Sequence, residues 1–298
     1  MPQYQSFPVK LCYHVDDILK IKEISRPINL AIVPCGRCNL NCEFCVSKKM
    51  QRIDLPLNKI LHFLDVTKPK SVDITGGEPT LYKDLIPLIK YMNDHHIDAG
   101  MITNGIALKP EMIKGLMWIR ISVNSYIDKG YSDAHLIEIE KNLSTKITYG
   151  FNYVYNINYK GTNFNKIIDF IKRHKFDYFR ISLDINHTDE LNVDFEKDIL
   201  SFKDDVRFIF RRKIEFGPRP DECFIGHLKP NMESDGIVYR CVLESEELMH
   251  SIPIGDIDHP EKILQYQGMN HACTRCHNYE QNKIIKELLE NQEHKNFI

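Results

Sequence analysis

The sequence predicts an α/β protein whose main domain contains a parallel sheet, and three observations lead to this fold class. Short apolar runs alternate with segments of helical period between residues 29 and about 185. Each apolar run ends in polar or glycine-containing residues, as strands do. The units repeat every 25 to 30 residues or so, which suits parallel strands joined by right-handed crossovers. Periodicity alone does not choose between an open sheet and a (β/α) barrel.

Six apolar runs are expected to form strands, and five segments between them are expected to form helices. The strands are 29–34, 71–75, 97–103, 118–124, 147–156 and 178–183, and the helices lie near 57–67, 82–95, 109–116, 132–143 and 164–175. In either architecture the functional residues should lie where strands end and helices begin.

The pattern changes after about residue 192. One helical segment is followed by short strands around 237–241 and 251–257, and then by a charged helix over about 279–293. We therefore expect a small C-terminal α+β domain. The predicted divisions are an N-terminal cap segment at 1–28, the main domain at 29–190 and the second domain at 191–298.

Composition excludes several classes of protein. The 298 residues are 43% apolar and 27% charged, and no run approaches the roughly 18 apolar residues that a membrane span requires. The N-terminus lacks the pattern of a secretory signal, so a cytoplasmic protein is expected. The net charge of −2 indicates no nucleic-acid partner and no membrane partner. A basic cluster indicates a solvated face or, alternatively, a pocket for an anionic substrate group; it comprises Arg207, Arg211, Arg212, Lys213 and Arg219.

Nine cysteines in a reducing compartment indicate metal binding or catalysis rather than disulfides. Four of them, Cys35, Cys38, Cys42 and Cys45, directly follow the first predicted strand. Zinc sites usually separate their cysteine pairs by about 12 or more residues, and the ferredoxin run orders its gaps differently. A third arrangement uses only the last three cysteines. They would hold three irons of a 4Fe-4S cluster and leave the fourth iron open to a cosubstrate.

This C-x3-C-x2-C spacing, with Phe44 before its last cysteine, resembles the signature of the radical S-adenosylmethionine (SAM) enzymes. The second predicted strand ends in Thr75-Gly-Gly-Glu-Pro79, which matches the GGEP loop of that family at the expected place. Glycines there allow close backbone approach, and Glu78 can accept from the methionine ammonium. The resemblance covers roughly residues 29–185 and implies a partial (β/α)6 barrel. It also implies that Cys35 is not a ligand, because SAM needs the fourth iron.

The resemblance implies further contacts at the strand ends. Ser122 resembles a hydroxyl contact to the SAM carboxylate or ribose, Arg180 could pair with that carboxylate, and Asn104 is a third candidate. The expected cofactor-binding residues are therefore Gly76, Gly77, Glu78, Asn104, Ser122 and Arg180. Four more polar residues on or near strand ends are candidate substrate contacts, although each could be an ordinary loop residue; they are Asn124, Asn152, Asp184 and His187.

Four further cysteines, Cys223, Cys241, Cys273 and Cys276, come from three separate segments and can close a zinc or an iron–sulfur site. The motif DG-x-V-x-x-C, followed by IGDI and a final CxxC, resembles the twitch or SPASM extension that carries an auxiliary 4Fe-4S cluster. Structural zinc is the alternative. The nearby histidines are assigned no ligand role; they are His227, His250, His259, His271 and His277.

The resemblance implies a radical SAM oxidoreductase with an external reductant such as flavodoxin or ferredoxin. It would cleave SAM reductively to a 5′-deoxyadenosyl radical and abstract hydrogen from a polar small molecule, such as a sugar or aminocyclitol. Net oxidation would use the auxiliary cluster as electron acceptor. Epimerisation comes second, because it needs a hydrogen donor and only Cys12 and Cys35 remain as thiols.

Three other functions compete with this one. Peptide maturation is possible, but residues 1–28 are too short for a leader-binding domain. The cyclase of molybdenum-cofactor synthesis is set aside, because the chain ends in His294-Lys-Asn-Phe-Ile298 without that enzyme's diglycine. A non-catalytic iron–sulfur or zinc protein would leave GGEP and the open-iron spacing unexplained.

Overall fold

The computed structural model describes residues 10–48, 50–156, 162–185, 187–202, 205, 207–211, 217–241, 253–268, 275–276 and 278–290. Its main feature is a curved ten-stranded sheet in the order β11-β10-β9-β1-β2-β3-β4-β5-β6-β7. Seven strands are parallel and adjacent in sequence order; they are β1 (Asn29–Ile32), β2 (Ser71–Ile74), β3 (Asp98–Thr103), β4 (Trp118–Ser122), β5 (Thr148–Tyr155), β6 (Tyr178–Leu183) and β7 (Phe208–Arg211). Because the order never reverses, the sheet is a partial barrel, which confirms the predicted fold class.

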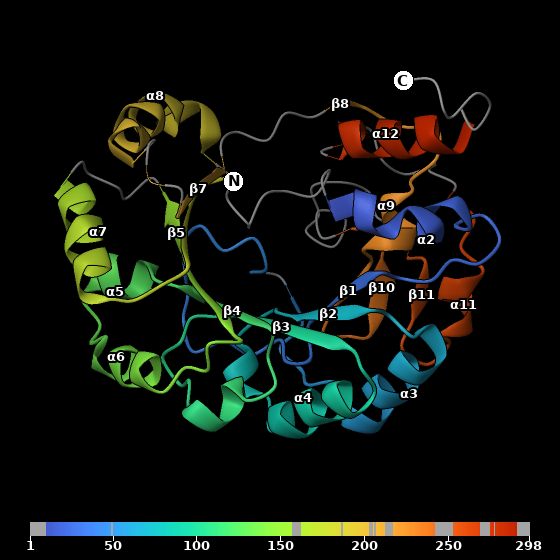
Figure 1. The fold of residues 1–298 in the computed structure, drawn as a ribbon, viewed down its shortest axis with the longest axis horizontal. Helices are drawn as coiled ribbons and strands as arrows, with labels where there is room; N and C mark the ends of the chain where they lie inside the picture. The colour runs from blue at the N-terminus through green and yellow to red at the C-terminus, as the bar shows by residue number, and fades with distance from the viewer. Residues whose placement is uncertain are drawn as a thin grey trace.

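Helices cover the convex side of the curved sheet (Figure 1). They are α3 (Leu57–Thr67), α4 (Leu85–Asp94), α5 (Asn124–Lys129), α6 (Ala134–Lys141) and α7 (Thr162–Arg173), while α8 (Thr188–Ile199) and η4 (Leu200–Phe202) connect β6 to β7. Alternation along the strands separates the two faces. In β4, Ile119 and Ile121 are fully buried in the core under the helices, whereas Arg120 and Ser122 occupy the concave face and are only half-buried.

The six strands predicted for residues 29–183 all form, and each end lies within two residues of the expected position. The prediction for β4 was two residues too long. Val123 leaves the extended conformation with φ −99° and ψ 6°, and the unpredicted helix α5 begins at Asn124. The expected helix at 109–116 is only a 3-10 turn, η3 (Pro110–Ile113). A proline and the nearby Gly115 at φ +89° explain why it ends early.

Residues after 190 extend the barrel sheet at both ends. β7 joins β6, while β9 (Asn231–Met232) pairs parallel with β1 and continues antiparallel into β10 (Ile237–Tyr239) and β11 (Gly255–Asp256). A separate small sheet pairs β8 (Gly217–Pro218) with β12 (Arg275–Cys276). The short helix α11 (Glu261–Leu264) follows β11. The predicted C-terminal unit therefore shares a sheet with the main domain, and its proposed boundary at 190 stays a prediction.

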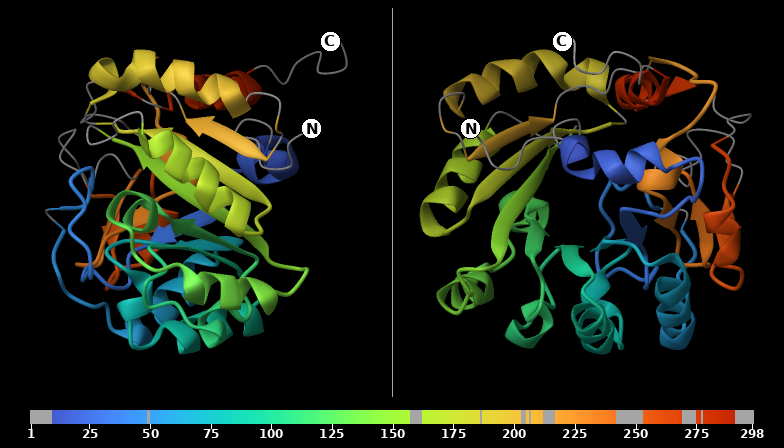
Figure 2. Two further views of the ribbon diagram at one scale, coloured as in Figure 1. Left: turned by 90° about the vertical axis from the view of Figure 1, so that its left-hand side faces the viewer. Right: turned by 45° about the vertical axis from the view of Figure 1, so that its right-hand side comes forward.

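A second hydrophobic core joins the two ends of the chain beside the sheet (Figures 1 and 2). It lies among α2 (Val15–Leu19), α9 (Ile225–Leu228) and α12 (Tyr279–Glu290), next to the short turn η1 (Cys12–His14). Its buried members include Ile18 and Ile285, both at 0% exposure, together with Cys223 and Phe224. The described part of the N-terminal segment thus packs against C-terminal elements, and its role as a cap stays a prediction.

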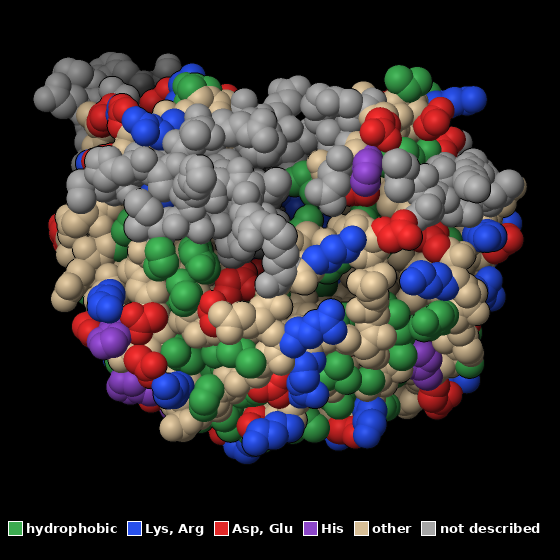
Figure 3. Space-filling view, turned by 180° about the vertical axis from the view of Figure 1, so that it is seen from behind, with side chains coloured by type: hydrophobic (Ala, Val, Ile, Leu, Met, Phe, Trp, Pro, Cys, Tyr) green, Lys and Arg blue, Asp and Glu red, His purple; other side chains and the backbone are tan. Residues whose placement is uncertain are grey.

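The surface carries acidic and basic side chains interspersed with polar and apolar ones on the face drawn in Figure 3. Among the described residues, no helix combines the length and apolar character that crossing a bilayer demands.

Candidate iron–sulfur and SAM site

The loop after β1 carries Cys38, Cys42 and Cys45, all half-buried. Burial raises the pKa of the Cys38 and Cys42 thiols, and the neighbouring cysteines raise the pKa of Cys42 further, so the three thiols share one neighbourhood. The Leu40 N–H donates to Cys38 Sγ at 3.4 Å. Within the described ranges, no three Cys, His, Asp or Glu side chains close around a single metal ion. A 4Fe-4S cluster makes a different demand, because each thiolate binds a different iron, and this all-thiol donor set fits it.

Cys35 has a different environment from the other three cysteines. It is fully buried at 0% exposure, and its thiol donates to the Arg37 carbonyl at 3.8 Å. Burial, together with a hydrogen bond to Asp54, raises the pKa of Cys35 to about 11. Its burial and its hydrogen bond to the Arg37 carbonyl place this thiol in the core. Its exclusion from the ligand set stays a prediction.

The glycines of the GGEP loop allow it to pack directly on the cysteine loop. Gly76 has φ +121°, and a Cβ atom there would lie 2.2 Å from Val33 Cγ1. A Cβ atom at Gly77 would lie 2.3 Å from the Arg37 carbonyl oxygen. The Gly77 N–H donates to Cys35 O at 3.2 Å, and the Glu78 N–H donates to Arg37 O at 2.7 Å. Any side chain at these glycines would push the two loops apart.

Glu78 organises three loops through its carboxylate, which is 1% exposed. Oε1 accepts from the Thr80 N–H at 3.0 Å, from Thr80 Oγ1 at 2.6 Å and from Thr103 Oγ1 at 2.5 Å. Oε2 accepts from the Asn104 N–H at 2.7 Å. Each carboxylate oxygen has about two lone pairs, and Oε2 accepts from one described donor, so Oε2 retains capacity for one more. The sequence suggested a ligand contact for Glu78 but gave no sign of this bracing role.

Asn104 contacts the cysteine loop. Its Nδ2 donates to Asn39 Oδ1 at 2.7 Å and lies 3.9 Å from Cys38 Sγ, while its Oδ1 accepts from the Ile106 N–H at 3.0 Å. Its side chain therefore positions the Cys38 segment, next to the predicted cofactor site. Asn39, its partner, was not predicted as a functional residue.

Three predicted residues form one row across the concave face. Ser122 of β4 pairs in register with Asn152 of β5, which pairs with Arg180 of β6. Asn152 Oδ1 accepts from Arg180 Nε at 2.7 Å and from Ser182 Oγ at 3.1 Å. Two expected cofactor residues, Ser122 and Arg180, and one expected substrate residue, Asn152, therefore lie together.

Asn124 and its neighbour Ser125 differ in whether their side chains have hydrogen-bond partners. Asn124 Nδ2 donates to Val154 O at 2.8 Å and Asp128 Oδ2 at 3.0 Å, and its Oδ1 accepts from the Val154 N–H at 2.8 Å. This amide ties α5 to β5, so its predicted substrate contact stays a prediction. Ser125 Oγ is buried and has no hydrogen-bond partner among the described residues. Ser125 was not predicted from the sequence. The only indication was its position three residues after Ser122, near the end of β4.

Asp184 and His187 form a pair at the end of β6. His187 Nδ1 lies 3.0 Å from Asp184 Oδ2; the carboxylate is 2% exposed and the imidazole 33%. No described residue forms a hydrogen bond with the other ring nitrogen of His187. A carboxylate that orients a half-exposed imidazole can support proton transfer.

Three of the four C-terminal cysteines lie around α12. Cys223 is buried in the second core and Cys241 packs against it. Asn282 Nδ2 donates to Cys276 Sγ at 3.6 Å, while Asn282 Oδ1 accepts from the Phe224 N–H at 2.7 Å. Asn282 therefore links Cys276 to the segment of Cys223, and it was missed by sequence reasoning. Cys273 lies outside the described residues.

The nearby histidines that the structure describes have other partners. His227 is 2% exposed, with Nδ1 2.7 Å from Ser25 Oγ. His259 is exposed and its Nδ1 lies 2.7 Å from Asp256 Oδ1. His250, His271 and His277 fall outside the described residues.

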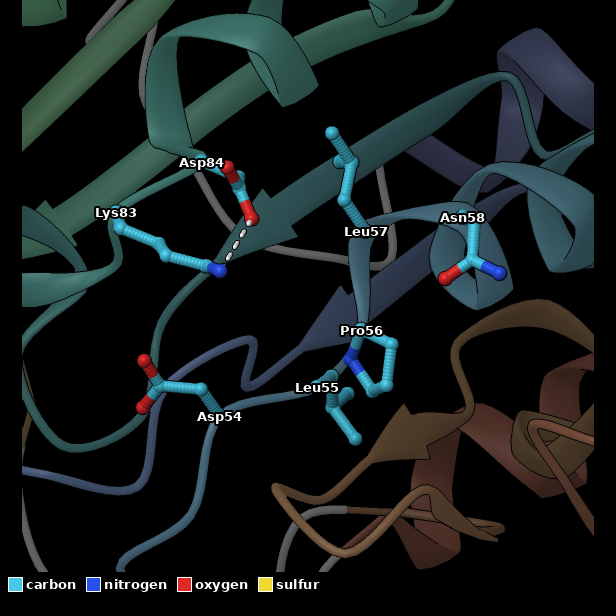
Figure 4. Close-up of a pocket in the computed structure, with 7 residues that line it drawn as sticks. All are labelled: Asp54, Leu55, Pro56, Leu57, Asn58, Lys83 and Asp84. Carbon is cyan, nitrogen blue, oxygen red and sulfur yellow. Dashed lines mark ion pairs between the residues drawn. The ribbon is translucent and has the colours of Figure 1, made fainter.

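A surface pocket of about 620 Å³ lies at the start of α3, beside the segment that leads into α4 (Figure 4). It is lined by Asp54, Leu55, Pro56, Leu57, Asn58, Lys83 and Asp84, and Lys83 pairs with Asp84 at 4.0 Å. None of the cysteines lines it, so the pocket is distinct from the candidate cluster site.

A partial (β/α) barrel with a three-cysteine loop and a GGEP loop at one sheet edge defines a class of iron–sulfur, SAM-binding proteins. Residues 32–126 match the family model described as "Radical SAM superfamily". The chain therefore carries a radical SAM domain, and that family brings with it a 4Fe-4S cluster and SAM.

The curated relatives include GTP 3′,8-cyclases. The one from Staphylococcus epidermidis (strain RP62A) is 31% identical over 183 residues, covering 53% of this chain and 52% of that protein. The one from Staphylococcus aureus (strain bovine RF122) is 28% identical over 225 residues, covering 66% and 65%. The chain thus spans about half the length of the first of these relatives. They belong to the cyclase group that sequence analysis had set aside.

Among solved structures, Streptococcus suis SuiB bound to its precursor peptide SuiA superposes with a TM-score of 0.58. The two chains are 19% identical, and the match covers 84% of this chain and 68% of SuiB. At this identity the likeness shows the fold, and it extends beyond the residues of the family match.

Proposed function

We propose that the protein is a radical SAM enzyme that abstracts a hydrogen atom from a polar small molecule. The observation that carries this proposal is the packing of Gly77 and Glu78 on the backbone of the cysteine loop, at the carboxyl edge of a parallel barrel. When bound, the cluster supplies the electron that cleaves SAM, and SAM supplies the 5′-deoxyadenosyl radical.

The chain's own residues would hold and orient these groups. Cys38, Cys42 and Cys45 would bind three irons, and their thiols must lose protons to do so. The free acceptor capacity of Glu78 Oε2 would receive the methionine ammonium. Asn104 would keep the cysteine loop in place through Asn39.

The substrate would lie on the concave face, near further polar groups. Ser122 and Ser125 would offer hydroxyls to SAM beside the end of β4. Gly76 and Gly77 would act indirectly, because they let the GGEP loop pack on the cysteine loop. Asn152 and Asn124 border the region between β4 and β6.

We further propose net oxidation of an alcohol or similar group. His187, oriented by Asp184, would take the proton that leaves with the oxidation. The remaining electron would pass to an auxiliary 4Fe-4S cluster bound by Cys223, Cys241, Cys273 and Cys276, with flavodoxin or ferredoxin as external reductant. Asn282 supports this second site through its contacts to Cys276 and Phe224.

A second candidate function is cyclisation of a purine nucleotide. The 31% identity to a GTP 3′,8-cyclase over 183 residues favours it. The two candidates differ in substrate and in the fate of the substrate radical, while the residues that hold the cluster and SAM are shared.

Anaerobic reconstitution followed by SAM and dithionite tests the common proposal. We expect 5′-deoxyadenosine to form and about eight irons per chain, as two 4Fe-4S clusters require. A variant lacking all three of Cys38, Cys42 and Cys45 is the matched control. Iron binding without any 5′-deoxyadenosine would instead support a non-catalytic iron–sulfur protein. Adding GTP, or a panel of sugars and aminocyclitols, then separates the two candidate substrates.

A further inference from the structure

Three arginines share the concave face of the barrel: Arg120 on β4, Arg180 on β6 and Arg211 on β7. Strand register places them there. Arg180 is level with Asn152, and Arg211 is level with Ser182 of β6, two residues closer to the carboxyl edge. In parallel pairing, residues in register have side chains on the same face. The three guanidinium groups therefore come from neighbouring strands and face one space.

Arg120 is held in place by aromatic rings. Its Nε donates to Tyr178 OH at 3.0 Å, and its guanidinium lies 5.2 Å from the centre of the Trp118 ring and 5.9 Å from that of Tyr178. A Cβ atom at Gly150, between Arg120 and Tyr178 in the register, would lie 2.3 Å from the Tyr178 ring. The glycine therefore makes room for this arrangement, and cation–π contact fixes the charge without neutralising it.

The cluster is unusual because nothing described balances its charge. No described carboxylate forms an ion pair with Arg120, Arg180 or Arg211, and Arg180 Nε donates only to the neutral amide of Asn152. Burial, then repulsion from Arg120 and Arg211, holds the pKa of Arg180 well below its usual value. Although Arg211 is exposed at the rim, the protein packed around it and repulsion from Arg120 lower its pKa as well.

Other basic residues nearby are paired. Arg207, just before β7, donates to Asp205 Oδ2 at 2.7 Å. At the opposite end of the barrel sheet, Lys229 lies 3.1 Å from Asp73 Oδ2 of β2. Close, uncompensated like charges on a barrel wall destabilise the protein unless an anion binds between them. The contrast with these paired residues indicates a site kept open for a ligand.

We propose that Arg120, Arg180 and Arg211 bind an oxyanion group of the substrate, a phosphate or a carboxylate. This inference rests on the proposed function for the reaction, and it names the chemical class of the substrate. Planar guanidinium groups bind such anions through two parallel hydrogen bonds. The three positions are spread over four residues of strand, about 13 Å, which suits a substrate with more than one anionic oxygen group.

The heights of the three arginines along their strands indicate which way the rest of the substrate would point. Arg211 lies at the carboxyl end of β7, toward the edge where the cysteine and GGEP loops lie, and Arg120 lies deepest. An anion held by the three arginines would leave the remainder of the molecule pointing to that edge. This proposal differs from the contact to the SAM carboxylate that the sequence suggested for Arg180, which stays an untested prediction.

Thermal unfolding of the reconstituted protein in sodium pyrophosphate, compared with sodium chloride of equal ionic strength, tests the inference; sodium citrate provides a carboxylate arm. We expect one of these anions to raise the Tm of the wild type, and Arg180→Gln and Arg211→Gln to weaken its binding at least tenfold. Arg207→Gln, which removes a charge already paired, should keep the full shift. Without anion, Arg180→Gln should unfold at the same or a higher temperature, because repulsion is relieved, whereas a structural arginine would lower the Tm.

Several outcomes would overturn the proposal. One is a wild-type Tm that rises no further in pyrophosphate or citrate than in chloride. Another is an anion-induced Tm shift in both arginine variants that equals the wild-type shift. A third is a tenfold loss of SAM binding in Arg180→Gln with no change in its anion-induced Tm shift. If Arg180→Gln does not fold, the rim residue Arg211 still gives the answer. Anion binding requires no SAM cleavage. Failure of the wild type to form 5′-deoxyadenosine would therefore count against the proposed reaction, and loss of the anion shift against this site.

Discussion

Arg37 and Asp54 form a bidentate pair between the cysteine loop and the segment before α3. Arg37 Nε donates to Asp54 Oδ1 at 3.0 Å and Nη2 to Oδ2 at 2.7 Å; Nη2 also donates to Leu81 O at 2.9 Å. One guanidinium thus joins three segments around the candidate cluster. Because both side chains are partly exposed, we expect the pair to contribute only about 0.2–1 kcal/mol to the free energy of unfolding.

The first prediction is that Asp54→Asn or Arg37→Gln changes the cluster more than the fold. Unfolding should shift little, while iron loss to a chelator should become several-fold faster, because the loop loses its anchor. Arg207→Gln is the control for losing an exposed pair elsewhere. The hydrogen bond from Arg37 lowers the pKa of Asp54 below its ordinary 3.8. The stabilisation is therefore present above that value and is lost as pH falls through the lowered folded pKa. Equal iron loss in both variants and the control would count against an anchoring role.

The second prediction separates Cys35 from its neighbours. Cys35→Ala should keep the cluster, because this thiol is fully buried in the core, at a cost of about 1 kcal/mol for the small cavity. Cys38→Ala, Cys42→Ala and Cys45→Ala should each lose it. Iron content and visible absorbance after anaerobic reconstitution report the result. A SAM-cleaving cluster that survives in any of the last three variants would refute the ligand assignment.

The third prediction concerns the carboxylate of Glu78. In Glu78→Gln an amide N–H₂ faces the donors of Thr80, Thr103 and Asn104, so at least one buried donor loses its acceptor. We expect a loss of roughly 1–3 kcal/mol in the free energy of unfolding, with weaker SAM binding. Chemical denaturation and equilibrium binding measure these effects. Glu111→Gln, which changes an exposed carboxylate, should alter neither the free energy of unfolding nor SAM binding. An unchanged free energy of unfolding in Glu78→Gln would show that the bracing role is wrong.

The barrel was predictable because short apolar strands alternate with helical segments along the chain. In Tyr178–Leu183 the polar and apolar side chains alternate, and the predicted and observed bounds coincide. The GGEP and cysteine loops were predictable because their residues are adjacent in sequence. Contacts such as Arg37 to Asp54, or Asn282 to Cys276, join loops whose relative positions no local pattern specifies.

The arginine cluster was only partly predictable for the same reason. The sequence grouped Arg211 with its neighbours in the chain, yet its partners in space, Arg120 and Arg180, come from strands that are adjacent only after the sheet forms. Of that sequence group, Arg207 is paired with Asp205. Proximity along the chain therefore indicated an anionic pocket as an alternative but did not identify its members.

The fourth prediction is a loss of stability in mild acid caused by His227. Burial, followed by the charge of Lys22, lowers the pKa of His227 from 6.5 to about 4. The unfolded chain would bind a proton below pH 6.5 that the folded protein does not bind until pH 4, so stability falls as pH drops through this window. The expected loss is roughly 3 kcal/mol. Urea unfolding at several pH values should show a flatter profile for His227→Gln. The exposed His62→Gln should retain the wild-type slope, and an identical slope in both variants would contradict the assignment.

The last prediction separates the two roles of Asn282 beside the C-terminal cysteines. Its Oδ1 accepts from the N–H groups of Phe224 and Ile225, and its Nδ2 donates to Cys276 Sγ. Asn282→Leu removes both functions and should cost about 1–3 kcal/mol, because buried N–H groups lose their acceptor. Asn282→Asp keeps an acceptor but places negative charge beside the sulfur. We therefore expect Asn282→Asp to unfold close to the wild type yet bind about four irons fewer, the content of one 4Fe-4S cluster. Full iron content in Asn282→Asp, measured alongside Cys276→Ala as the variant that lacks the ligand itself, would show that Asn282 supports the fold and not the auxiliary site.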